Sequence, residues 1–139
     1  MNAGTDSREA WEALATERAS AQERLTGLER DFAGIVESSA SANADDEHDP
    51  EGATIAFERQ HLVALIEQAR DHLAAIDAAR QRVADGTYGR CEICGQPIAP
   101  ERLAARPTAT RCLACASQRR RLHRLLMGRQ GVALVRLFT

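Results

Sequence analysis

Lysine is absent from this chain of 139 residues, and aromatic side chains are scarce, with three Phe, one Tyr and one Trp. A chain with so few large rings, and with many Ala, Leu, Arg and Glu residues, favours long helices over a β-sandwich or a β-barrel. No apolar run approaches the roughly 20 residues that a membrane-spanning helix needs, and the first residues are not a basic stretch followed by an apolar one. We therefore expect a mainly α-helical protein that is located in the cytoplasm and has no membrane partner.

Negative and positive charges are separated along the chain, although the formal net charge is only −2. Residues 1–50 carry 12 acidic side chains against four arginines, whereas residues 91–139 carry two against nine. The acidic first part and the basic last part are therefore expected to face different partners. The exclusive use of arginine carries little functional weight, because a compositional bias of the source genome can produce it.

Two stretches repeat apolar residues in alternating steps of three and four, which is the spacing of a coiled-coil seam. The first predicts a helix over about residues 6–37, and the second predicts a helix that ends near residue 85. The first seam consists of Trp11, Leu14, Arg18, Ala21, Leu25, Leu28, Phe32 and Ile35, and the second of Leu62, Ile66, Ala69, Leu73, Ile76, Arg80 and Val83.

Capping residues mark the start of the first helix. Asp6 followed by Glu9 fits an N-cap with its capping-box partner. Thr5 and Ser7 are competing caps, because their hydroxyl groups can accept the same backbone hydrogen bond. The first helix is therefore expected to begin close to residue 6.

The second helix has signals at both ends. Asp49 fits an N-cap, and Pro50 fits the first helical position because proline is favoured there. Gly86 can adopt the left-handed conformation that ends a helix without steric cost. The small, polar and acidic stretch from residue 38 to 52 has no apolar period, so it predicts a loop.

Two heptad helices of about 30 residues, joined by one loop, most simply form an antiparallel hairpin roughly 45 Å long. We expect a coiled-coil hairpin within residues 1–85, an acidic tip near residues 38–53, and a monomer. An intermolecular coiled coil has the same pattern; we favour the hairpin because a single capped break separates the two seams. Snorkelling can accommodate Arg18 and Arg80 on the seam in either arrangement.

Two cysteine pairs, Cys91-x2-Cys94 and Cys112-x2-Cys115, are separated by 17 residues. This spacing is typical of a four-cysteine zinc site, in which two tight turns each supply two thiolates. Gly95 follows the first pair, where such a turn often needs a residue at positive φ. We expect one structural zinc ion, because four protein ligands leave no position for a catalytic water.

Other chemistries were weighed for the cysteines. A redox C-x-x-C motif needs only one pair and is usually surrounded by alternating strands and helices, which are missing here. Disulfides are not expected in a reducing compartment. Iron is the next metal to consider after zinc. The expected zinc module covers residues 86–127 and includes a C-terminal basic helix, and residues 128–139 are left as a tail without assigned structure.

The stretch from Asp85 to Cys115 resembles the DksA/TraR family of C4-type zinc fingers. The likeness extends beyond the cysteines to four dipeptides, namely Tyr88-Gly89, Pro97-Ile98, Arg102-Leu103 and Arg106-Pro107. Together with the two heptad helices it covers about residues 6–126. The resemblance implies a bacterial transcription regulator that binds RNA polymerase through the secondary channel, with the zinc module near the channel rim and without sequence-specific DNA recognition.

The resemblance also implies a role for the acidic loop, whose tip would approach the polymerase active centre. Acidic side chains there can meet basic channel residues or a magnesium ion; the plain alternative is a solvated connector. One departure is Gly52, which stands where the family's second tip aspartate is expected, while Asp49 matches the first. The tip candidates are Asp45, Asp46, Glu47, Asp49 and Glu51.

A second departure concerns the alarmone ppGpp, which some family members bind together with polymerase. The basic positions expected for that ligand fall at Gln68, Ala75 and Ala116. A polyanion needs cations, so we expect weak or no dependence on ppGpp unless Arg70 or Arg119 substitutes.

Three other functions were considered. A basic helix with Arg119, Arg120, Arg121 and Arg124 can contact nucleic-acid phosphates, but arginines there also solvate a helix face, and no stacking aromatic accompanies them. Direct nucleic-acid binding is therefore not expected. The four scattered histidines form no pair with a nucleophile, so the protein is not expected to be an enzyme. The hairpin can also be a general protein-interaction rod.

Overall fold

The computed structural model describes residues 3–42 and 50–130. It contains α1 (Ala3–Ala42), α2 (Pro50–Asp85), α3 (Pro100–Ala105) and α4 (Leu113–Gln130). The described residues contain no β-strand beyond an isolated antiparallel bridge between Arg90 and Pro97. The chain divides into two units, Met1–Ala84 and Asp85–Thr139. The predicted mainly α-helical fold, a helical hairpin followed by a cysteine module and a helix, is confirmed.

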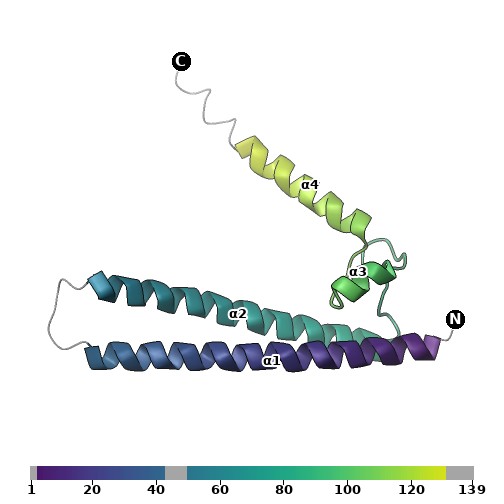
Figure 1. Ribbon diagram of the computed structural model, residues 1–139. Helices are drawn as coiled ribbons and strands as arrows, with labels where there is room; N and C mark the ends of the chain where they lie inside the picture. Colours follow the sequence, from purple (N-terminus) through teal and green to yellow (C-terminus); the bar gives the residue numbers. More distant parts are fainter. Residues whose placement is uncertain (1–2, 43–49, 131–139) are drawn as a thin grey trace, which may run out of the picture. The chain divides into compact units, whose positions relative to one another are not determined.

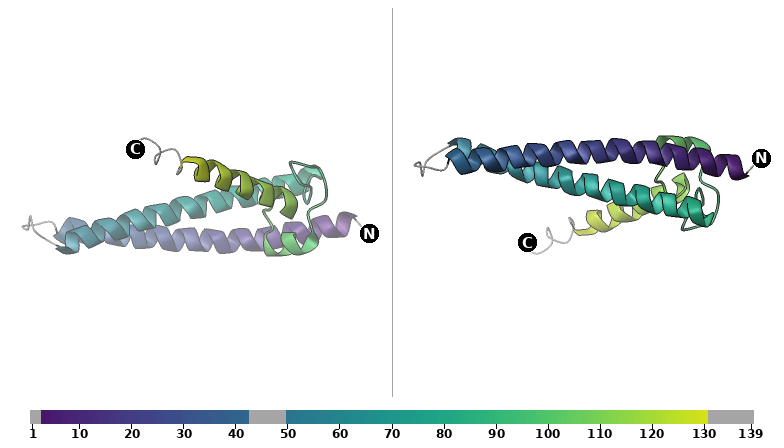
Figure 2. Two further views of the ribbon diagram at one scale, coloured as in Figure 1. Left: turned by 90° about the horizontal axis from the view of Figure 1, so that it is seen from above. Right: turned by 90° about the horizontal axis from the view of Figure 1, so that it is seen from below.

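The first unit is an antiparallel hairpin, in which α1 and α2 lie side by side (Figures 1 and 2). Trp11, early in α1, has the guanidinium of Arg80, late in α2, 4.2 Å from its ring centroid. Phe32, late in α1, has the guanidinium of Arg59, early in α2, 5.8 Å from its ring centroid. Contacts therefore run in opposite order along the two helices, as an intramolecular hairpin requires.

Both predicted seams supply the core of the hairpin. Leu14 and Ile76 are fully buried, and a side chain of this size contributes about 1.5–3 kcal/mol when it leaves water. Burial decreases toward the tip, where Leu28, Phe32 and Leu62 are only half-buried. The buried residues of the hairpin are Leu14, Ala21, Leu25, Ile66, Ala69, Leu73, Ile76 and Ala79, of which Ala79 was not among the predicted seam residues.

The two seam arginines keep their charged groups at the edge of the hairpin. Arg18 Nε donates to Asp77 Oδ1 over 2.8 Å, with 39% of the Arg18 side chain exposed. Arg80 instead stacks on Trp11, and its Nε is buried without a hydrogen-bond partner. Arg18 therefore shows the arrangement that snorkelling predicts, whereas the guanidinium of Arg80 is held by a cation–π contact instead.

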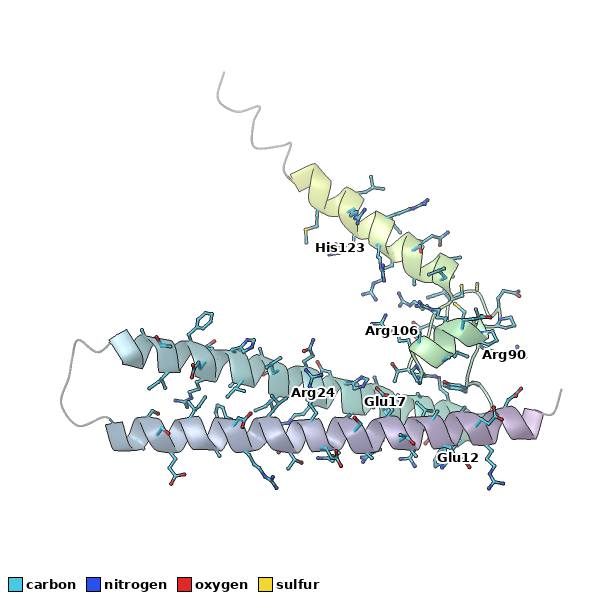
Figure 3. All side chains as sticks on the ribbon, viewed as in Figure 1. Glu12, Glu17, Arg24, Arg90, Arg106 and His123 are labelled. Carbon is cyan, nitrogen blue, oxygen red and sulfur yellow. The ribbon has the colours of Figure 1, made fainter. Side chains whose placement is uncertain are left out.

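A further ion pair and a contact between a histidine and a carboxylate cross the hairpin at its flanks. Arg70 Nη2 lies 3.0 Å from Glu29 Oε1, and His72 Nε2 lies 3.0 Å from Glu17 Oε1. Figure 3 shows Glu17 on the side of α1 toward α2 and Glu12 on the opposite side. These pairs set the register because each joins one position of α1 to one position of α2.

Two predictions about α1 are corrected. The helix begins at Ala3, so Asp6 lies in its first turn rather than at the N-cap. A carboxylate in the first turn is still favourable beside the positive end of the helix dipole. The helix also continues to Ala42 instead of ending near residue 37, and the hydroxyl of Ser38 donates to the carbonyl of Gly34 over 2.8 Å. Serine that bonds back to its own helix is tolerated there, so the loop is shorter than predicted.

The predicted bounds of α2 are confirmed. The helix begins at Pro50 and ends at Asp85, and Gly86 follows with φ 75°. Proline fits the first turn because no intrahelical acceptor awaits its missing N–H. Asp49, the expected N-cap, lies outside the described residues.

Candidate metal centre

The first cysteine turn is held by backbone hydrogen bonds. Gly95 N donates to Cys91 O over 3.0 Å, and Cys91 N donates to Gln96 O over 2.9 Å. Gly95 has φ 71°, which confirms the expectation that this turn requires a residue at positive φ. The turn therefore brings Cys91 and Cys94 to one end of a tight loop.

The second cysteine turn is the start of a helix. Helix α4 begins at Leu113, and Ala116 N donates to Cys112 O over 3.0 Å. Cys115 therefore stands in the first turn of α4, one turn after Cys112. The sequence predicted a basic helix in this module but not that it begins within the second cysteine pair. At its other end α4 runs through Gly128 to Gln130, since one glycine weakens a helix by only about 1 kcal/mol.

A short bracket joins the two cysteine turns. Glu92 N donates to Thr110 O over 2.9 Å. The Glu92 carboxylate accepts from Arg111 Nε over 2.7 Å, and Arg111 O accepts from Arg102 Nε over 2.8 Å. Because Glu92 and Arg111 are sequence neighbours of Cys91 and Cys112, these bonds bring the two turns together.

Helix α3 fills the loop between the turns. It begins with Pro100 in its first turn, a signal in the sequence that was not used to predict it. Beyond it, the hydroxyl of Tyr88 donates to Pro107 O over 2.8 Å. The small core of this unit consists of Cys91, Ile98 and Ala109. Because so little apolar surface is buried, a bound metal ion would contribute much of the stability of this unit.

The four sulfur atoms gather where α4 begins (Figure 3), all within 4.8 Å of one another. Zn–S bonds of about 2.3 Å in a tetrahedron give an S···S edge of about 3.8 Å. The Sγ atoms of Cys94 and Cys112 are 3.8 Å apart. The residues present therefore fit a zinc ion, and the predicted single structural zinc is confirmed at the level of the C4 finger and its cysteine cluster.

The surroundings shift the pKa values of two of the four thiols in opposite directions. Hydrogen bonds from backbone amides, first that of Cys94, lower the pKa of Cys91 to about 6. The hydrogen bond with the neighbouring thiol of Cys112 raises the pKa of Cys115 to about 12. A bound dication stabilises every thiolate.

The remaining predicted site residues fall into two groups. Arg119, Arg120, Arg121 and Arg124 are exposed on α4. The tip candidates Asp45, Asp46, Glu47 and Asp49 lie outside the described residues, as does the side chain of Glu51 at the start of α2. Their role stays a prediction.

A cleft in the second unit was missed by the sequence analysis. Its volume is 440 Å³. Three of its arginines come from the zinc module and two from α4, and no periodic pattern links them. The lining residues are Glu92, Arg102, Arg106, Thr108, Ala109, Thr110, Arg111, Ala116, Arg119 and Arg120.

None of the helices within residues 3–42 and 50–130 combines the length and the apolar character needed to cross a membrane. A long antiparallel helical hairpin followed by a four-cysteine zinc finger is the class of protein that the fold and the site define.

Known proteins share this combination. Residues 86–121 match the model of the prokaryotic dksA/traR C4-type zinc finger. The solved structure of transcription factor DksA2 from Pseudomonas aeruginosa superimposes with a TM-score of 0.73 and 27% identity, over 86% of this chain and 87% of that chain. The zinc module of this chain is therefore a finger of the DksA/TraR C4 type, and the chain as a whole is similar in fold to DksA2.

Sequence relatives match over part of the chain. Protein YteA of Bacillus subtilis is 41% identical over 76 residues, or 55% of this chain and 32% of that protein. The RNA polymerase-binding transcription factor DksA of Caulobacter vibrioides is 44% identical over 61 residues, or 42% of this chain and 43% of that protein. The chain therefore matches less than half the length of each of these two relatives.

Proposed function

We propose that this protein is a transcription regulator that binds bacterial RNA polymerase directly and inserts its hairpin into the secondary channel. The observation that carries the proposal is one chain with a long hairpin and a C4 finger, superimposable on DksA2 over 86% of its length. The likeness of part of the chain to a relative described as RNA polymerase-binding supports the same partner. No sequence-specific DNA recognition is part of this function.

The hairpin is long enough to carry its tip into a channel. Helices α1 and α2 contain 40 and 36 residues, so at 1.5 Å per residue each is roughly 55 Å long. A rod of that length can carry an acidic loop deep into a narrow channel. We assign the tip to Asp45, Asp46, Glu47, Asp49 and Glu51, whose carboxylates would meet basic groups or a magnesium ion.

The zinc module depends on its metal ion for its fold. We assign four ligands whose sulfur atoms all lie within 4.8 Å of one another, namely Cys91, Cys94, Cys112 and Cys115. Four thiolates leave no open position on the metal, so its contribution is to fold the module. No residue is assigned a catalytic role, and the proposed regulator acts as a cytoplasmic monomer.

The test is a binding and transcription experiment with purified bacterial RNA polymerase and the full zinc-loaded chain. One variant has all five tip acids replaced by their amides. A control for charge loss elsewhere, Asp6→Asn with Glu9→Gln, removes two acidic charges from exposed positions near the other end of α1. The expected result is that both variants bind polymerase, but only the tip variant loses its effect on transcription.

Other outcomes contradict the proposal at separate points. If the native chain fails to bind polymerase, the result favours the alternative that the hairpin is a rod that binds another protein. An unchanged transcriptional effect in the tip variant removes the function from the tip and reduces the acidic loop to a solvated connector.

A further inference from the structure

We propose that the arginine cleft of the zinc module, together with one face of α4, binds the phosphate backbone of double-stranded nucleic acid without reading its sequence. The cleft has a volume of 440 Å³, and five arginines and one glutamate line it, so their formal charge is +4. All of these residues belong to the second unit. The inference requires neither the tip nor polymerase, so it is independent of the proposed function.

Most of the positive charge in the cleft is uncompensated. The single glutamate, Glu92, is paired with Arg111 at 2.7 Å. Among the described residues, the side chains of Arg106, Arg119 and Arg120 form no ion pair or hydrogen bond. Unpaired like charges around one concavity repel each other, and an anion with several charges relieves that repulsion.

The positive surface continues beyond the cleft along α4. With 3.6 residues per turn, Arg120 and Arg124 follow Ala116 on one side of the helix, whereas Arg121 is turned away by about 100° from Arg120. Figure 3 shows Arg106 and His123 on the same side of α4. A cleft whose positive charge continues to Arg124, one turn further along α4, suits an extended polyanion better than a single small ion.

The chemistry of the lining favours phosphates over an acidic protein. Protein interfaces usually have an apolar or aromatic centre, but the cleft offers only the methyl groups of Ala109 and Ala116 as apolar side chains. Thr108 and Thr110 add hydroxyl groups, which commonly contact phosphates together with arginine. Interfaces with nucleic acid are typically polar and positively charged.

The absence of aromatic side chains from the lining selects the form of the nucleic acid. Single-stranded nucleic acid is bound largely by stacking of its bases on aromatic rings. None of the residues lining the cleft is aromatic, and α4 contains no Phe, Tyr or Trp. A duplex needs no such platform because its bases are already stacked and paired. Contacts to its backbone alone carry no sequence information.

The experiment measures fluorescence anisotropy of short labelled DNA duplexes of two unrelated sequences, with the full zinc-loaded chain and no polymerase. We expect equal affinity for both sequences and a steep decrease with salt. Each phosphate contact adds about 0.9 to the slope of log K against log salt. Arg120→Gln should lower that slope by about 1, and Arg119→Gln with Arg120→Gln by about 2.

The matched control is Arg121→Gln, which removes the same charge from the same exposed helix but does not line the cleft. It should leave the slope unchanged, and circular dichroism and zinc content should be unchanged in all variants. Equal losses for Arg120→Gln and Arg121→Gln would reduce the effect to net charge and overturn the proposal. So would absence of duplex binding at low salt, with tripolyphosphate or polyglutamate bound in its place.

Discussion

Arg18 Nε lies 2.8 Å from Asp77 Oδ1, and this contact joins α1 to α2 across 59 positions of the chain. The guanidinium lowers the pKa of the Asp77 carboxyl below its usual value, chiefly through the hydrogen bond. Both side chains are largely open to water, so salt weakens their attraction. The pair therefore contributes little to the free energy of unfolding. It shows which position of α1 faces which position of α2.

A pH dependence follows from this pair. Because the folded-state pKa of Asp77 is lowered, its stabilisation is present above the unfolded value and is lost as pH falls through the folded value. Asp77→Asn should therefore lower the melting temperature slightly at neutral pH but not at an acidic pH below the folded-state pKa of Asp77, which itself lies below the ordinary value of about 3.9. A double-mutant cycle with Arg18→Gln, run at both pH values, isolates the pair from other carboxylates. A coupling free energy between Arg18 and Asp77 that persists at the acidic pH would contradict this prediction.

The core of the hairpin gives a larger effect. Ile76 is fully buried, so Ile76→Ala should reduce the free energy of unfolding of the hairpin by about 2–5 kcal/mol. Val63 lies in the same helix with 39% of its surface exposed, and Val63→Ala should cost about 1 kcal/mol or less. Urea unfolding followed by circular dichroism measures both. Equal losses would mean that the seam is not the core.

Removal of zinc should unfold the second unit and leave the first unit folded. Structural zinc contributes on the order of 10 kcal/mol to such a module, so a chelator at neutral pH should unfold about residues 88–126. Most helical residues belong to α1 and α2, with 40 and 36 residues against 18 in α4. Much of the helical circular dichroism should therefore survive while protease sites in the module open. Unchanged protease resistance after chelation would refute the structural role of zinc.

Two glycines should respond in opposite directions to alanine. Gly95 has φ 71°, and a Cβ built there meets nothing within 4 Å, so Gly95→Ala tests backbone conformation alone. A left-handed alanine costs about 1–2 kcal/mol, which should weaken zinc binding about 5- to 30-fold in a competition assay. Gly27 lies inside α1 in open space, and Gly27→Ala should stabilise the hairpin by about 0.5–1 kcal/mol.

The response to ppGpp is expected to be weak. Gln68, Ala75 and Ala116 stand at positions where a cation would be needed, and Arg70 is already paired with Glu29 at 3.0 Å. Arg119, the other possible substitute, does line the cleft beside Ala116. Transcription assays should show equal effects with and without ppGpp. Strong potentiation that disappears in Arg119→Gln would show that Arg119 replaces the missing cation.

Local patterns in the sequence were sufficient for several features. Pro50 and Gly86 marked both ends of α2 because proline and glycine have few alternative conformations at helix ends. The start of α1 was misplaced, since Asp6 is as favourable in a first turn as at an N-cap. Helix α3 was missed because six residues are too few to show a period.

By itself, the sequence determined the two seams and the four-cysteine centre, whereas the structure decided between the antiparallel hairpin and an intermolecular coiled coil. Periodicity and ligand spacing are properties of neighbouring residues, so they can be read without coordinates. Only the tertiary structure decided that Arg18 meets Asp77, and that Arg102, Arg106 and Arg120 surround one cleft. A period identifies which face of a helix is buried but not its register against another helix. Arginines on irregular loops have no period, and the fold around the metal centre alone brings them together.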